Sequence, residues 1–174
     1  MFKKLLIISL VYYIKSSFGA PINYDKTRCK TASADYLLRD NNIIQKKEYD
    51  NKKSNPLLID LKFFVIHDND NGKVNRSRIN NQVNILNEAY GGKQHELGIN
   101  SNIMFKVKRI VYINDKTLYN SCGKKESEII DKYPGDTKKY ISIYTCDDEY
   151  LGYAYYPWHK YEGHKEQAVF MNPI

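Results

Sequence analysis

The residues best suited to acid–base chemistry or metal binding in this chain are its four histidines, His67, His95, His159 and His164. Only His159 and His164 lie close together, in the segment His-Lys-Tyr-Glu-Gly-His. Five residues correspond to about 500° of helical rotation, so the two imidazoles would not share a helix face, and the glycine disfavours a helix. Because catalytic zinc needs three protein ligands, we predict an exposed polar loop here and no metal-ligating or catalytic residues.

The chain has three cysteines that could form a disulfide, Cys29, Cys122 and Cys146. An exported protein can form disulfides, and three thiols leave one without a partner within the chain. Cys122 and Cys146 flank one loop-helix-strand unit, which makes them the favoured pair, although connectivity does not follow from sequence alone. Cys29 is then either a free thiol or an alternative disulfide partner.

Export is predicted by residues 1–19, which have the organisation of a secretory signal peptide. Lys3 and Lys4 precede an apolar stretch over residues 5–14, and small residues surround a cleavage point near Gly19. The apolar stretch is too short to span a bilayer, so we expect a secreted, extracellular product with no membrane association once the signal is removed. A transmembrane anchor is the alternative.

The charge pattern does not indicate a nucleic-acid partner. The formal net charge is +7 and falls to +4 without residues 1–19, which contain three lysines and no acidic residue. The remaining basic residues are interspersed with acidic ones, as in Lys124, Lys125, Glu126 and Glu128. This mixture is typical of a solvated surface and lacks the basic stripe of a nucleic-acid-binding face.

The chain length suits one domain, preceded by a leader. Residues 20–56 are polar and irregular and are interpreted as a leader or pro-like segment. The sequence then changes to LLIDLKFFVIHD over residues 57–68, whose dense apolar content predicts a central strand covered on both faces. The domain is therefore assigned to residues 57–174.

A helix is expected over residues 76–90. Its apolar positions recur at helical spacing, at Ile79, Val83, Leu86 and Tyr90, and Gly91 and Gly92 mark its end. Asn75 precedes it as a predicted N-cap. In Asn75-Arg76-Ser77 the same asparagine also matches a glycosylation acceptor, so it is a candidate glycan site or simply the cap.

Further strands and one short helix follow. Residues 103–112 alternate like a strand whose register slips near Lys108 and Arg109, as a β-bulge requires, and residues 125–133 suggest a short helix. Residues 140–157 read as two strands joined by an acidic turn, the second over residues 151–156, and one more strand follows. The expected fold class is α/β (α+β), a twisted mixed five-stranded sheet with one main backing helix.

The segment YISIYTCDDEYLGYAYYPW at residues 140–158, together with AVFMNP at 168–173, resembles the pappalysin (cytophagalysin) family of metzincin zinc endopeptidases. The helix sequence INNQVNILNEAY also fits that family. The resemblance implies the upper half of a metzincin domain, with zinc as the cofactor of the intact family. The zinc-binding sequence His-Glu-x-x-His is nowhere in this chain, so we expect an inactive protein or a fragment that ends before the zinc-binding helix.

The resemblance also assigns roles to particular residues. It implies a position at the sheet edge for the strand containing Leu151, Gly152, Tyr153, Ala154 and Tyr155. That strand would pair with an extended peptide or protein substrate, and small residues there would let a peptide backbone approach. Cys29, in Thr-Arg-Cys-Lys-Thr, would be a latency thiol that caps the zinc of an intact enzyme.

Two other interpretations are alternatives to a peptidase fragment. One is a secreted non-catalytic module that uses the same edge strand to bind a peptide or protein. The other is a small exported structural protein unrelated to peptidases.

Overall fold

The computed structural model describes residues 55–94, 98–155 and 164–173. The predicted signal peptide, nearly all of the leader, and the candidate residues Cys29, His95 and His159 lie outside these ranges. In chain order the elements are β1 (Leu57–His67), α2 (Arg76–Tyr90), β2 (Ile103–Asn114), α3 (Lys116–Tyr119), the 3-10 helix η4 (Cys122–Lys124), α4 (Glu126–Lys132), β3 (Ile141–Thr145), β4 (Gly152–Ala154) and β5 (Ala168–Met171).

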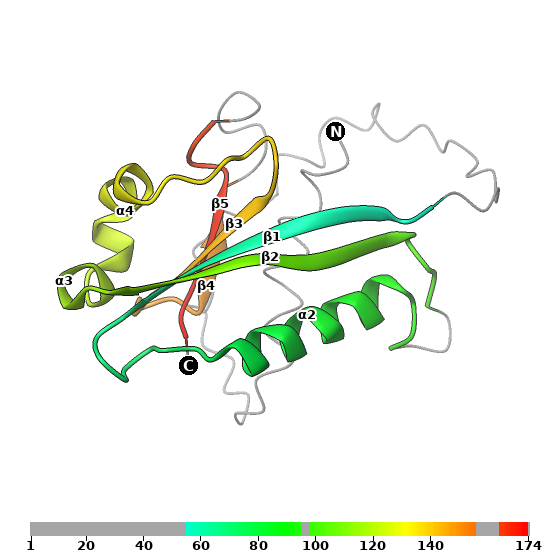
Figure 1. Ribbon diagram of the computed structural model, residues 1–174, viewed down its shortest axis with the longest axis horizontal. Coiled ribbons are helices and arrows are strands. Elements are labelled where there is room, and N and C mark those ends of the chain that lie inside the picture. Colours follow the sequence, from blue (N-terminus) through cyan, green and yellow to red (C-terminus); the bar gives the residue numbers. More distant parts are fainter. Residues whose placement is uncertain (1–54, 95–97, 156–163, 174) are drawn as a thin grey trace, which may run out of the picture.

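The five strands form one mixed sheet in the order β2-β1-β3-β5-β4 (Figure 1). β1 pairs in parallel with β2 and β3, β3 pairs in parallel with β5, and β4 alone runs antiparallel, to β5. This confirms the predicted α/β class and the mixed five-stranded sheet. No helix among the described residues is both long and apolar enough to cross a membrane.

β1 occupies the internal position that its apolar sequence predicts. It lies between β2 and β3, and its second half, from Phe63 to His67, is buried on both faces of the sheet. A parallel strand between two neighbours is normally covered on both sides, which explains the nearly continuous apolar run.

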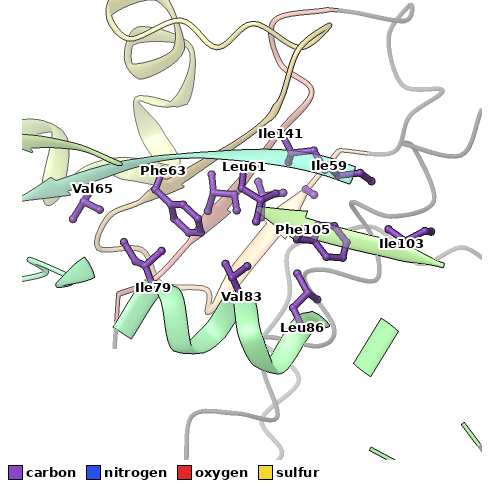
Figure 2. Close-up of a cluster of buried hydrophobic side chains, with 13 residues drawn as sticks. Ile59, Leu61, Phe63, Val65, Ile79, Val83, Leu86, Ile103, Phe105 and Ile141 are labelled. Atoms are coloured by element: carbon purple, nitrogen blue, oxygen red, sulfur yellow. The ribbon is translucent and has the colours of Figure 1, made fainter. Parts of the chain in front are cut away.

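Helix α2 covers one face of the sheet and begins and ends as its sequence predicts. The Oδ1 atom of Asn75 accepts a hydrogen bond from the backbone N–H of Arg78 at 2.8 Å. The chain leaves the helix through Gly91 and then Gly92, whose φ of +72° is readily accessible only to glycine. Figure 2 shows three helix side chains directed at the strands, Ile79, Val83 and Leu86.

The predicted bulge is present in β2. Val107 lies opposite Leu61 and Arg109 opposite Lys62, so Lys108 is the extra residue on the bulged strand. The short helix predicted over residues 125–133 is α4, and the structure adds α3 and η4 before it.

The other face of the sheet is covered by these short helices, in a second apolar cluster that contains Leu118, Ile129 and Ile130. A row of aromatic rings crosses this cluster from strand to strand. Neighbouring ring centroids lie 4.6 Å apart for Phe64 and Tyr144, 5.0 Å for Tyr144 and Phe170, and 5.2 Å for Phe170 and Tyr153. The row therefore joins β1, β3, β5 and β4 on one face.

The strand-turn-strand segment is arranged differently from a hairpin. β3 and β4 are consecutive in sequence, but β5 lies between them in the sheet. The alternation of Ile141, Ser142, Ile143 and Tyr144 is typical of a half-buried strand, whereas all five residues of β3 are buried. The cause is its position between two parallel neighbours, with apolar clusters on both faces.

Candidate functional site

The candidate site is β4, the strand that the sequence analysis assigns to peptide binding. It is the last of the described strands in the sheet, as predicted, and it is antiparallel to β5. It comprises Gly152, Tyr153 and Ala154, so Leu151 and Tyr155 lie immediately outside it, and Tyr156 lies beyond the described residues.

The hydrogen-bond register determines which backbone groups face outward. The N–H of Asn172 on the β5 side donates to the carbonyl of Leu151 at 3.0 Å. Bonded and non-bonded pairs alternate along an antiparallel ladder, so the N–H and C=O of Tyr153 are directed at β5. The backbone groups of Gly152 and Ala154 are consequently directed away from β5, toward the edge.

Gly152 has a second reason to be small. A Cβ atom at this position would lie 2.9 Å from the carbonyl oxygen of Phe170, closer than side chains normally approach a backbone atom. The absence of a side chain is therefore required by the packing of β5 against β4. The sequence indicated only the approach of a peptide, because the contact with Phe170 depends on the tertiary structure.

Two tyrosines connect β4 to α4. The hydroxyl groups of Tyr153 and Tyr155 both donate to the Oε2 atom of Glu126, at 3.2 Å and 3.0 Å. Burial, reinforced by the Glu126 carboxylate, raises the pKa of Tyr155 to about 12 and that of Tyr153 further. Both phenols therefore remain protonated donors at neutral pH. Glu126 was not predicted from the sequence, because Tyr153 and Tyr155 lie 27 and 29 residues after it and no local pattern indicates that they are in contact.

The opposite edge of the sheet, β2, is blocked. From α2, Asn87 donates through Nδ2 to the carbonyl of Phe105 at 3.0 Å and accepts from the Phe105 N–H through Oδ1 at 2.7 Å. This side chain takes the place of a neighbouring strand. The bulge at Lys108, whose ammonium lies 3.2 Å from Asp60, adds an irregularity and a charge, which are devices that protect sheet edges.

A disulfide joins Cys122 in η4 to Cys146, which directly follows β3, with the two Cα atoms 5.8 Å apart. This is the pair favoured by the sequence analysis, and both residues are buried. It attaches the segment leading into α4 to the sheet. The predicted role of Cys29 concerns a residue outside the described ranges.

The described residues do not fit a catalytic zinc ion. His67 is 5% exposed at the end of β1, and its Nδ1–H donates to the carbonyl of Asn69 at 2.8 Å. His164 lies next to Glu166, with its Nδ1 3.7 Å from the carboxylate. Within residues 55–94, 98–155 and 164–173, no three His, Cys, Asp or Glu residues are grouped so that they could hold a metal ion.

Asn75, the predicted glycan site, is an exposed residue at the start of α2. Its Oδ1 atom caps the helix, while a glycan would be attached to Nδ2. The two roles are therefore compatible, and glycosylation stays a prediction.

Comparison with known proteins places the fold. No family model and no curated protein matches the chain. Among solved structures, a promirolysin mutant of Tannerella forsythia matches with a TM-score of 0.59 and 21% identity, over 69% of this chain and 47% of that one. Mirolysin in complex with compound 9 and Tannerella forsythia mature mirolysin in complex with a cleaved peptide match with TM-scores of 0.57 and 0.51, each at 21% identity over 69% of this chain and 54% of theirs.

The chain thus spans about half the length of these metalloproteases. At this level of identity the likeness establishes a common fold. The described residues adopt the fold of part of a metzincin-type metalloprotease domain.

Proposed function

We propose that this chain is a secreted, pappalysin-like relative of the zinc endopeptidases whose own contribution is to hold an extended peptide along β4. Its sequence contains no His-Glu-x-x-His zinc site, and the activity that we propose for it is binding of the peptide. In intact members of that family, zinc would supply the hydrolytic chemistry, with ligands that the described residues do not provide.

The observation that carries this proposal is the arrangement of β4 in a metzincin-type fold. β4 is the last of the described strands in the sheet, and the backbone groups of Gly152 are directed away from β5. A peptide that adds to such an edge gains backbone hydrogen bonds, which provide affinity with little dependence on sequence.

The contrast between the two edges of the sheet supports the choice of β4. β2 is longer, but Asn87 occupies both backbone groups of Phe105, and Lys108 interrupts the register. β4 carries small residues at the positions whose backbone is directed outward. Strand addition is therefore favoured at β4 and opposed at β2.

Backbone-directed binding can be tested with two N-methylated versions of one extended peptide. Only alternate residues of a bound strand direct their N–H groups at the neighbouring strand. Methylation of the set facing β4 should abolish binding, and methylation of the other set should preserve it, as measured by isothermal titration calorimetry. Equal affinity of both versions would contradict strand addition.

The second candidate is a non-catalytic module whose natural ligand is a folded protein partner. It shares the edge strand with the first candidate and differs from it in the ligand, a folded protein in place of an extended peptide. Chelator-sensitive cleavage of casein by the purified chain, with zinc added, would exclude a non-catalytic module. Binding of a partner that is unaffected by competing extended peptide would exclude the use of the β4 edge.

A further inference from the structure

β4 is a short strand that depends on contacts beyond its own ladder. It has three residues, and β5 is its single partner among the described strands. Two short paired strands are marginally stable by themselves. Contacts from the rest of the domain must therefore keep the β4 backbone extended.

Glu126 provides such a contact from the first turn of α4. One oxygen, Oε2, accepts from both Tyr153 and Tyr155, at 3.2 Å and 3.0 Å. Both hydroxyls reach the same carboxylate oxygen of α4, so both tyrosine side chains extend toward the side of the sheet that α4 covers. Ala154, whose backbone is directed outward, is the residue between them.

The helix that carries Glu126 is itself well anchored. Ile129 and Ile130 have exposed fractions of 0%, and the disulfide at Cys122 attaches the segment just before α4 to the end of β3. The carboxylate therefore occupies a defined position relative to the sheet. Hydrogen bonds to a charged group are also stronger than those between neutral groups.

We propose that Glu126 is a positioning residue for the edge: its carboxylate holds Tyr153 and Tyr155 and thereby keeps β4 extended and paired with β5, the form that strand addition of a peptide requires. The peptide part of this inference rests on the proposed function. The positioning of β4 does not, and it can be measured without any ligand.

The experiment compares three variants of the full chain. Glu126→Ala removes the acceptor, whereas Glu126→Gln keeps an oxygen that can accept from both hydroxyls. Glu128→Ala is the matched control, because Glu128 lies in the same helical turn, its side chain is 53% exposed, and it forms an ion pair with the neighbouring Lys125.

The first measurement is hydrogen exchange of the Tyr153 amide, which faces β5. Glu126→Ala should raise its exchange rate on the order of tenfold or more, with the amides of β1 unchanged. Glu126→Gln should restore most of the protection, and Glu128→Ala should match the unmodified protein. The second measurement is the affinity for the extended peptide, which should follow the same order.

Three results would overturn the inference: unchanged Tyr153 exchange in Glu126→Ala, equal acceleration in Glu126→Ala and Glu128→Ala, or failure of Glu126→Gln to restore protection. If Glu126→Ala does not fold, Tyr155→Phe removes one of the two bonds and should accelerate exchange severalfold. If the unmodified protein binds no extended peptide but the exchange results are as expected, the proposed function fails and the positioning role stands.

Discussion

Replacing Asn87 by alanine should both destabilise the domain and expose the β2 edge. Its side chain makes two hydrogen bonds with the backbone of Phe105, at 3.0 Å and 2.7 Å, and joins α2 to β2. Alanine keeps the helical backbone but removes both bonds. The N–H and C=O of Phe105 then lose these partners at an edge strand.

The expected cost follows from the number of bonds lost. Each hydrogen bond contributes a net ~0.5–1.5 kcal/mol, so the free energy of unfolding should fall by about 2 kcal/mol. For a domain of this size the melting temperature should drop by roughly 6 °C. The unpaired backbone groups should also promote edge-to-edge pairing between molecules, visible as concentration-dependent association.

The assay is urea denaturation followed by circular dichroism, together with sedimentation velocity at several concentrations. Asn84→Ala is the matched control, because Asn84 is an exposed asparagine of the same helix, three residues earlier. It should change the free energy of unfolding by at most about 0.5 kcal/mol. If both variants lose the same stability, or if neither does, the reasoning about Asn87 is refuted.

Four other outcomes are expected. Gly152→Ala should lower the free energy of unfolding by about 1–3 kcal/mol, because the added Cβ would lie 2.9 Å from the carbonyl oxygen of Phe170 in β5. An unchanged melting temperature would contradict this, since β5 would then have moved to accommodate the Cβ without cost. Reduction of Cys122–Cys146, which closes a loop with a sequence separation of 24, should cost about 3 kcal/mol, and equal urea midpoints in both redox states would contradict this. A hydrogen bond from the backbone N–H of Leu118, assisted by Lys132, lowers the pKa of Asp115 in the folded state. The resulting stabilisation is fully present above the unfolded pKa, roughly 3.9, and is lost as pH falls through the lowered folded pKa. Asp115→Asn should remove this part of the acid dependence, measured as unfolding free energy against pH. Finally, the chain purified without added metal should carry no stoichiometric zinc, which elemental analysis can check.

Several elements were predictable because their determinants are local. Three features depend only on residues close together in the sequence. They are the apolar run of β1, the helical spacing of α2 with its Asn75 cap, and the slipped alternation around Lys108. Burial periodicity and capping act over such short distances, so the sequence alone indicates them. The same holds for a strand near Ala154, indicated by small and aromatic residues after an acidic turn, whereas its position at the sheet edge came from the family resemblance.

The tertiary structure decided what depends on residues far apart in the chain. It placed β5 between β3 and β4, so consecutive strands do not pair, and it buried β3 on both faces. It also brought Glu126 to Tyr153 and Asn87 to Phe105, which lie 27 and 18 residues apart. No local pattern encodes these pairs, because each polar side chain satisfies its hydrogen bonds with whichever backbone or hydroxyl group the packed sheet brings within reach.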